Sequence, residues 1–354
     1  MRIAVTGATG NVGTAVVRRL LADGHAVNGV ARRPPDAEFS GSSAVTWTSA
    51  DLATDCQELL GQAFRGCDAV VHLAWGFQPS HDLAYLERLG VGGTEQVLQA
   101  ARGAGVAHVV HMSSFGAYAP RTGPAPVDES WPTTGVTSSP YSRHKVAAER
   151  CVDRFETATP DVRVARLRPG IIGQRSAGSA LLRYGLPGLV PAAVLRALPL
   201  LPLDRRLELP VVHADDVADA VSRILDTAAV GAFNLAADPV ITVEHLAAAL
   251  GTVHVQVPAP VVRAAASLSW HARVQQVDPG WVDLAYQLPL VDTARAGSEL
   301  GWRPATDAVT TLEEVVAGMR SSAADATPAL RHRSITENVV RAWTRGPVSR
   351  RREP

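Results

Sequence analysis

The stretch Ile3-Ala4-Val5-Thr6-Gly7-Ala8-Thr9-Gly10-Asn11-Val12-Gly13 decides the fold of this chain. A dinucleotide pyrophosphate needs backbone N–H groups and a helix N-terminus at close range, and side chains would block that approach. Gly7 permits the tight turn, Gly10 the approach of the phosphates, and Gly13 the close packing of helix on strand. A purely structural glycine turn is the alternative, but a strand before the loop and a helix after it favour binding. Thr9, Asn11 and Val12 are therefore also expected at the cofactor.

Short apolar runs alternate with helical segments through the first half of the chain. Strands are expected over residues 2–6, 26–31, 45–47, 69–74, 108–112 and 162–167, and helices over 12–22, 94–104 and 141–155. Beyond residue 170, helices are expected over 215–226 and 242–250, and one more strand of the same sheet over 232–235. This alternation predicts an α/β fold, a Rossmann-type doubly wound parallel sheet with right-handed crossovers.

Three regions follow from this pattern. Residues 1–170 are expected to form the dinucleotide-binding Rossmann domain, to which residues 211–236 return. Residues 171–320 are expected to form a smaller, interwoven C-terminal lobe that binds the substrate. Residues 321–354 are a polar, basic tail, expected to be solvated, with a capping box at Ser334 and Glu337.

Composition excludes several classes of partner. The 354 residues carry a formal net charge of zero, which does not favour nucleic acid. The odd number of cysteines, three, fits no disulfide framework and indicates the cytoplasm. The chain starts on an apolar strand without a signal-peptide pattern, and charged residues and prolines interrupt the apolar stretch 181–203, so no membrane helix is expected. The histidines lack metal-site spacing, so no metal is expected.

The end of the second strand indicates the cofactor. In this fold an acidic residue there binds the ribose 2′-hydroxyl of NAD, whereas an arginine accommodates the 2′-phosphate of NADP. The strand ends in Ala31-Arg32-Arg33, which predicts NADP, with NAD and a merely solvated basic turn as the alternatives. Asp51 and Leu52, after the third strand, are expected near the adenine.

A tyrosine and a lysine lie four residues apart in Tyr141-Ser142-Arg143-His144-Lys145, so a helix places both side chains on one face. A nearby ammonium is expected to lower the pKa of the Tyr141 phenol, which would then exchange a proton with a carbonyl or alcohol oxygen. Lys145 is also suited to hold the nicotinamide ribose. Ser114, at the carboxyl end of a parallel strand, is expected to bind the substrate oxygen. A chance surface pair is the alternative reading of the tyrosine and lysine.

Taken in order, these motifs resemble the extended short-chain dehydrogenases/reductases of the NAD-dependent epimerase/dehydratase family. The resemblance rests on residues 7–13, 51–52, 71–74, 93–94, 113–114, 141–145, 168–170, 212–217, 233–235 and 300–304. It implies that Leu73 and Ala74 line the cofactor groove and that Arg168-Pro169-Gly170 lies near the nicotinamide. A homodimer through paired helices is common in this family and is expected here on that ground alone.

Three positions depart from the family pattern. Gly90 replaces an asparagine with a proposed proton-relay or helix-bending role, and Ala31 replaces the acidic residue for NAD. Leu209 replaces an arginine that binds the diphosphate in many sugar-nucleotide epimerases. If Arg205 lies in the same strand, it is about 13 Å from that position and too far to substitute for it.

The sequence therefore predicts an NAD(P)-dependent oxidoreductase of the carbonyl reductase or alcohol dehydrogenase type, acting on a small, apolar molecule with Tyr141 as acid and base. The alternatives are a nucleotide-sugar epimerase or dehydratase with bound NAD, and a non-catalytic NADP sensor. Two tempting features have plainer explanations: His72 is expected to be a packed histidine, and Asp215 and Asp216 are expected to cap a helix rather than bind metal.

Overall fold

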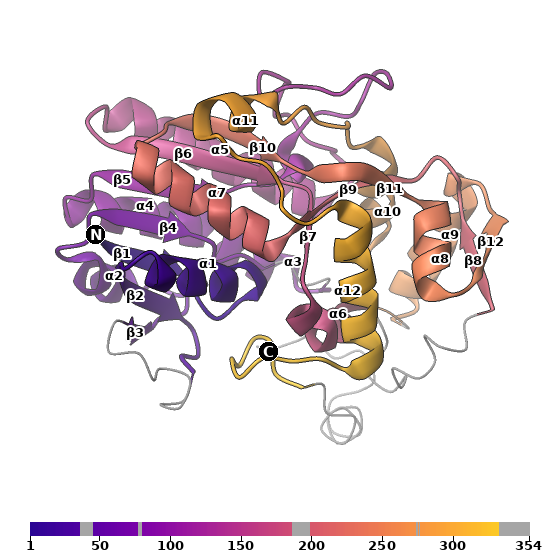
Figure 1. Cartoon of the computed structure of the whole chain (residues 1–354), viewed down its shortest axis with the longest axis horizontal. Coiled ribbons are helices and arrows are strands. Elements are labelled where there is room, and N and C mark those ends of the chain that lie inside the picture. The colour runs from indigo at the N-terminus through magenta and orange to yellow at the C-terminus, as the bar shows by residue number, and fades with distance from the viewer. Residues whose placement is uncertain (36–44, 77–79, 186–198, 274, 276, 333–354) are drawn as a thin grey trace.

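A parallel sheet of seven strands forms the centre of the larger lobe, on the left in Figure 1. The computed structural model describes residues 1–35, 45–76, 80–185, 199–273, 275 and 277–332. The strands are β1 (Arg2–Thr6), β2 (Ala26–Ala31), β3 (Val45–Ser49), β4 (Ala69–His72), β5 (His108–Met112), β6 (Arg163–Pro169) and β10 (Gly231–Leu235), in the order β10-β6-β5-β4-β1-β2-β3. Every neighbouring pair is parallel, which confirms the predicted Rossmann-type fold.

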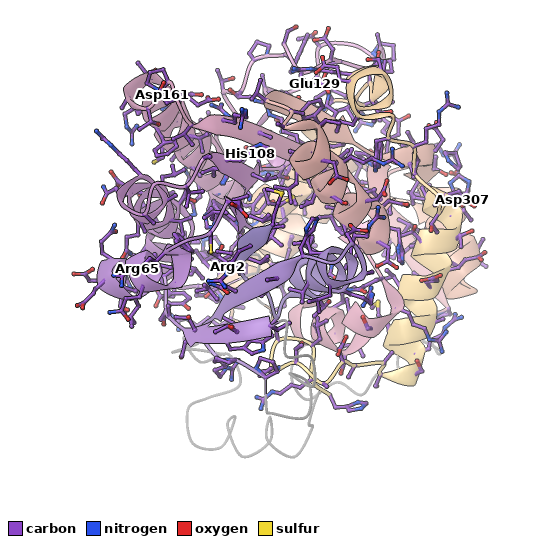
Figure 2. All side chains as sticks on the ribbon, turned by 60° about the vertical axis from the view of Figure 1, so that its left-hand side comes forward. Arg2, Arg65, His108, Glu129, Asp161 and Asp307 are labelled. Atoms are coloured by element: carbon purple, nitrogen blue, oxygen red, sulfur yellow. The ribbon has the colours of Figure 1, made fainter. Side chains whose placement is uncertain are left out.

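The order of the strands reverses between β1 and β4, because β2 lies on one side of β1 and β4 on the other. In an open parallel sheet, ligands bind at the carboxyl ends of the strands beside such a reversal. Exposed charged residues, among them Arg2, Arg65 and Asp161, lie near the opposite, amino-terminal ends (Figure 2). The topology therefore places a binding site at the end of β1, where the glycine loop begins.

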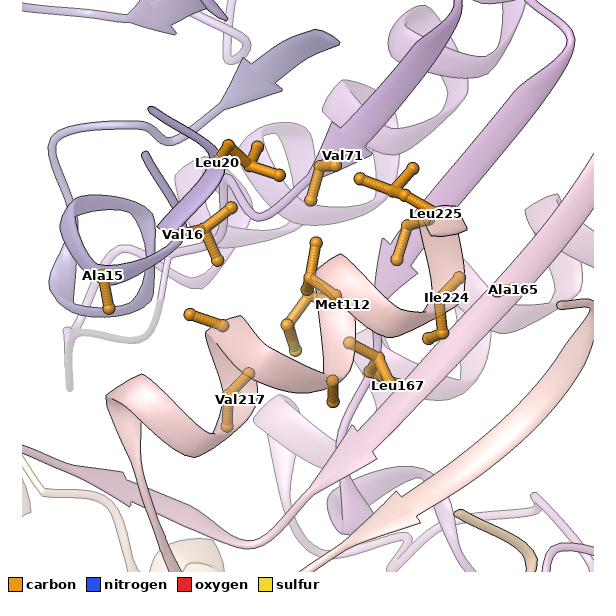
Figure 3. Close-up of a cluster of buried hydrophobic side chains, with 14 of the residues drawn as sticks. Ala15, Val16, Leu20, Val71, Met112, Ala165, Leu167, Val217, Ile224 and Leu225 are labelled. Carbon is orange, nitrogen blue, oxygen red and sulfur yellow. The ribbon is translucent and has the colours of Figure 1, made fainter. Parts of the chain in front are cut away.

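Helices cover both faces of the sheet, and this is why its central strands are almost continuously apolar. One face carries α1 (Asn11–Ala22) and α7 (Ala214–Thr227), and the other carries α2 (Gln57–Phe64), α4 (Gly93–Gly103) and α5 (Pro140–Ala158). Figure 3 shows the first face, where Leu20 of α1 and Ile224 of α7 are fully buried with Val71 of β4. This packing holds α1, and with it the glycine loop, in a fixed position on the sheet.

The second lobe is built from short strands and helices. A three-stranded sheet has the order β11-β9-β7, with β7 (Ile171–Gly173), β9 (Glu208–His213) and β11 (Ala237–Thr242), and β8 (Leu200–Leu203) pairs in parallel with β12 (Val253–Gln256). The longer helices are α6 (Gly178–Gly185), α8 (Val243–Leu250), α9 (Ala259–His271), α10 (Pro279–Gln287) and α12 (Ala308–Ser321). The remaining short helices are α3 (Leu83–Glu87), η1 (Arg88–Gly92), η2 (Phe115–Ala117), η3 (Arg175–Ala177) and α11 (Ala294–Leu300).

The segments that cross between the two lobes differ from the predicted ones, residues 211–236. Strand β9 joins the second sheet, so the chain returns to the Rossmann domain with α7 rather than at residue 211. Helix α11, within the range predicted for the second lobe, packs into the first core through Ala296 and Leu300. The reason is that apolar patterning marks a segment as buried but not the sheet that buries it.

Asp215 and Asp216 do not cap α7 as predicted. The helix begins one residue earlier, and the Nδ1 atom of its N-cap His213 accepts a hydrogen bond from the Asp215 amide at 3.1 Å. Asp216 instead accepts hydrogen bonds from the amides of Ala305 and Thr306, at 2.8 and 3.2 Å. This carboxylate therefore fixes the chain between α11 and α12, which starts at its own N-cap, Asp307 (Figure 2).

Residues 323–332 are only partly solvated, in contrast to the predicted tail, because Thr327 and Leu330 are buried whereas Ala326, Arg331 and His332 are exposed. The capping box at Ser334 and Glu337 lies outside the described residues. In the described part of the chain, no helix combines the length and the apolar character needed to cross a membrane. The three cysteines are buried free thiols, and no metal-binding group of three His, Cys, Asp or Glu side chains occurs in these ranges.

Candidate active site

A cavity of about 610 Å³ opens at the carboxyl ends of β1, β2, β4, β5 and β6, between the two lobes. Its lining includes all but one of the residues predicted for the site: Gly7, Thr9, Gly10, Asn11, Val12, Gly13, Arg32, Asp51, Leu52, Leu73, Ala74, Ser114, Tyr141, Lys145 and Pro169. The exception is Arg33, which does not line the cavity. The fold thus gathers residues from seven separate segments of the chain around one space.

Two glycines of the loop, Gly7 and Gly13, have no room for a side chain. Gly7 has φ +71°, and a Cβ there would lie 2.7 Å from the amide nitrogen of Ala74. A Cβ on Gly13 would lie 2.1 Å from the Gly7 carbonyl oxygen. Gly10, the N-cap of α1, has no side chain to satisfy the first amides of the helix. These amides and the helix dipole therefore remain suited to an anionic group such as a pyrophosphate.

The Asn11 side chain ties the glycine loop to the second lobe. Its Nδ2 donates to the carbonyl of Ile172 at 2.9 Å, and its Oδ1 accepts from Nε2 of Gln174 at 2.9 Å. Gln174 also donates to the Asn11 backbone carbonyl at 2.6 Å. Asn11 therefore fixes the loop against β7 in addition to lining the cavity, and sequence patterns gave no sign of Gln174 as its partner.

Arg32 lines the cavity at the end of β2, whereas Tyr141 lines it from α5. It follows β2, and its Nη1 donates to the phenol oxygen of Tyr85 at 2.7 Å. Tyr85 lies on α3, which follows β4, and it lines the same cavity. Asp51 and Leu52 line this end as well. A guanidinium held in this position fits the phosphate on the adenosine ribose of NADP.

Tyr141 lies in the first turn of α5, which begins after the N-cap Ser139. A Cβ on Gly116 would lie 2.7 Å from Cε1 of Tyr141, so this glycine makes room for the ring beside Ser114. Burial raises the pKa of Tyr141 to about 12, against the opposing effect of a hydrogen bond with Ser114. The expected lowering of this pKa is therefore wrong for the protein alone, because desolvation of the phenolate dominates.

Lys145 is the only lysine in the chain, one turn after Tyr141 on α5. Its Nζ donates to the carbonyl of Met112 at 2.9 Å and lies 3.6 Å from the centroid of the Trp75 ring. Burial lowers the pKa of Lys145 from 10.5 to about 7, although the Glu149 carboxylate raises it. The ammonium is thus held by one hydrogen bond and one aromatic face in a dry environment.

Trp75 fills the space that the absent asparagine side chain leaves. A Cβ on Gly90 would lie 2.9 Å from Cη2 of Trp75, so a larger residue would push the indole away from Lys145. Gly90 lies in the π-helical turn η1, and its carbonyl accepts a hydrogen bond from the Thr94 hydroxyl at 2.7 Å. The distortion of this helix therefore persists without the asparagine.

Two tryptophans flank the Tyr141 ring. Trp281 of α10 lies with its ring centroid 4.8 Å from that of Tyr141, and Trp75 meets the same ring edge-on at 6.3 Å. Both indoles line the cavity. Neither tryptophan belongs to a sequence motif, so sequence patterns did not place either of them beside Tyr141.

Two polar residues beneath the site, His72 and Arg168, have partners within the fold. His72 is buried between the hydroxyls of Thr6 and Thr94, at 2.7 and 3.0 Å, which confirms a packed histidine. Burial lowers its pKa to about 3, with a smaller contribution from Lys145. Arg168 does not face the cavity but pairs with Glu149 at 2.9 Å, while Pro169 and Gly170 line the cavity.

The wall supplied by the second lobe is apolar. Its lining residues are Ile171, Ile172, Gly173, Ala177, Ala180, Leu181, Glu208, Leu209, Pro210, Val211, Trp281, Leu284, Ala285, Leu288, Leu312, Val315, Ala329 and Leu330. Within the described ranges Glu208 is the one charged member, and Arg121 neutralises it at 2.6 Å. Arg205 and Arg206 lie in a turn before β9, not in the strand as assumed, and Arg206 pairs with Asp204 at 2.8 Å.

Residues 3–236 match the family model of the NAD dependent epimerase/dehydratase family. The chain belongs to this family. An uncharacterised protein of Mycobacterium tuberculosis is 30% identical over 325 residues, covering 90% of this chain and 30% of that protein. The chain thus spans only 30% of the length of this relative. Sterol demethylase protein B of Methylococcus capsulatus is 31% identical over 221 residues, covering 58% of this chain and 66% of that protein.

Solved structures share the fold of this family member. The structure of UDP-glucose 4-epimerase from Thermus thermophilus, in complex with NAD, matches with a TM-score of 0.68 and 21% identity. The match covers 91% of this chain and 100% of that one. At this identity the likeness establishes the fold, and the chemistry of the present chain has to be argued from its own side chains.

Proposed function

We propose that this family member is an NADP-dependent oxidoreductase that reduces the carbonyl group of a small, apolar molecule or oxidises the matching alcohol. The observation that carries the proposal is the apolar wall opposite the glycine loop. Leu209 stands where a diphosphate substrate would need a cation, and the charged residue beside it, Glu208, is an acid that is already paired with Arg121. An anionic nucleotide sugar would meet an unfavourable environment there.

The residues around Tyr141 are suited to proton transfer. When bound, the dinucleotide would supply the hydride to the carbonyl carbon. The Tyr141 hydroxyl would donate its proton to the carbonyl oxygen, which yields the alcohol, and Ser114 would hold that oxygen by a hydrogen bond. A phenol with a pKa near 12 stays protonated at neutral pH, which is the form that donation requires.

Lys145 has two roles in this proposal. Its ammonium would hold the nicotinamide ribose and would stabilise the phenolate that forms when Tyr141 gives up its proton. The Met112 carbonyl and the Trp75 face fix the position of Nζ. Proton return to Tyr141 from solvent would complete the cycle.

Arg32 supports NADP over NAD. The strand-end position carries Ala31 in place of an acidic residue, and Arg32 lines the cavity with its guanidinium braced by Tyr85. A planar guanidinium binds a phosphate with two hydrogen bonds, whereas it offers no comparable gain to a ribose hydroxyl.

The fold and the tyrosine–lysine pair are equally compatible with an epimerase, and a solved relative of that name binds NAD. Calorimetry with UDP-glucose and UDP-galactose separates the two functions. The proposal expects no binding of either nucleotide sugar and consumption of NADPH with some apolar ketone or aldehyde. Micromolar binding of either UDP-sugar would replace the reductase with the epimerase.

A further inference from the structure

The chain that follows α12 folds back onto the glycine loop. We define residues 323–332 as the C-terminal segment. It begins where the Ala323 amide donates to the Gly318 carbonyl at 2.7 Å and the Ala323 carbonyl accepts from the Ser179 amide at 2.8 Å. Thr327 is fully buried, and its hydroxyl donates to the backbone carbonyl of Thr9 at 2.9 Å. This bond joins the C-terminal segment to the glycine loop.

Internal hydrogen bonds give the segment one compact form. The Leu330 amide donates to the Thr327 carbonyl at 3.1 Å, and the Asp325 amide donates to the Leu330 carbonyl at 3.0 Å. The Leu330 side chain, 2% exposed, packs on Ala177 and Ala180 of the second lobe. The segment therefore contacts the glycine loop on one side and the region of η3 and α6 on the other.

The backbone at the end of α12 approaches η3 and the start of α6 closely, and this contact positions the C-terminal segment. A Cβ on Gly178 would lie 2.2 Å from the carbonyl carbon of Gly318, and one on Gly318 would lie 2.2 Å from the Arg175 carbonyl oxygen. The end of α12 thus packs directly on η3 and the start of α6. Larger residues at either glycine would displace α12 and the chain that leaves it.

We propose that the C-terminal segment is a further part of the dinucleotide-binding site and slows release of the bound cofactor. Ala329 and Leu330 line the same cavity as Gly7 and Gly10 of the loop. An apolar wall beside the loop excludes water from the pyrophosphate, which strengthens its interaction with the loop amides. The proposal concerns any dinucleotide in this fold and does not depend on the choice of NADP or on the reaction.

Two shortened chains test the segment. One ends at His332 and keeps it, and the other ends at Ser322 and lacks it. Release of NADPH and of NADH is followed by stopped-flow fluorescence after displacement with excess oxidised cofactor, and the dissociation constants are measured by titration. The chain ending at His332 is the reference, because it keeps the whole C-terminal segment. The chain ending at Ser322 should release both cofactors at least about tenfold faster, because it lacks the wall beside the glycine loop. A tenfold change corresponds to about 1.4 kcal/mol.

Point variants test the same idea in the full-length chain. Thr327→Val removes the hydrogen bond to Thr9, and Leu330→Ala removes the apolar wall, so both should speed release several-fold. Thr227→Val is the matched control, because the Thr227 hydroxyl donates to a backbone carbonyl at 2.7 Å on the exposed end of α7, away from the cavity. Melting temperatures verify that each variant is folded.

Release that is unchanged in both point variants, or equal in the two shortened chains, would overturn the proposal. Tighter binding by the chain ending at Ser322 would also overturn it, because the segment would then obstruct the site. The cofactor preference is tested separately by the ratio of the NADPH and NADH affinities. The segment should change both affinities by the same factor, so failure of one proposal is distinguishable from failure of the other.

Discussion

The single lysine of the chain allows its protonation to be observed directly. Burial lowers the pKa of Lys145 from 10.5 to about 7 in the free protein, with Glu149 opposing the change. Its side chain is buried, and the Met112 carbonyl is its hydrogen-bond acceptor. Lysine labelled with ¹³C at Cε should give one side-chain NMR signal, which should titrate with a midpoint near 7.

The aromatic ring of Trp75 contributes to the pKa of Lys145. Its ring lies 3.6 Å from Nζ, and a desolvated cation–π contact is worth about 0.5–2 kcal/mol. Since 1.36 kcal/mol corresponds to one pH unit, Trp75→Leu should lower the pKa of Lys145 by about 0.4–1.5. Leucine keeps an apolar neighbour but offers no aromatic face to the ammonium.

The same pKa shift predicts a pH-dependent stability. Between about pH 7 and 10.5 the unfolded chain would hold a proton on Lys145 that the folded chain does not. The free energy of unfolding should therefore rise with pH across this window, by up to about 1.4 kcal/mol per pH unit. Lys145→Met should lack this contribution, which denaturation at several pH values would reveal.

A denatured sample is the control for the titration, because its lysine should titrate at about 10.4. A midpoint above pH 9 in the folded protein would refute the reasoning, since it would mean that the Lys145 ammonium is hydrated. A rise of the pKa in Trp75→Leu would refute the cation–π contribution alone.

Three other substitutions test the site. Tyr141→Phe should lower turnover by ~10²-fold or more with little change in cofactor affinity, and near-normal turnover would show that the proton has another source. Arg32→Ala should remove much of the preference for NADPH in a fluorescence titration, whereas equal affinities in the unmodified protein would contradict the assignment. Gly13→Ala places a Cβ 2.1 Å from the Gly7 carbonyl and should abolish cofactor binding or folding. Gly61→Ala, with open space around its Cβ on α2, is the control and should melt no earlier than the unmodified chain.

The order of elements in the Rossmann domain could be predicted from the sequence, because each signal there is local. A glycine loop between a strand and a helix favours dinucleotide binding, and the four-residue spacing of Tyr141 and Lys145 needs only a helix to place them on one face. The strand ends that carry Arg32 and Ser114 meet at one edge because the sheet is parallel. Short-range sequence patterns were therefore enough to predict which residues of these motifs line the cavity.

Tertiary structure alone decided the surroundings of these groups. Trp75 reaches Lys145 because Gly90 leaves space on a different helix, and desolvation, which no motif encodes, moves the pKa values of Tyr141 and Lys145. Thr327 meets Thr9 across 318 positions of the chain. Patterns of a few residues specify local backbone and the face that is buried, whereas contacts between distant segments depend on how the whole chain packs. For that reason the sequence predicted the cofactor loop and the acid–base pair, and only the fold revealed the aromatic neighbours of that pair and the segment that covers the loop.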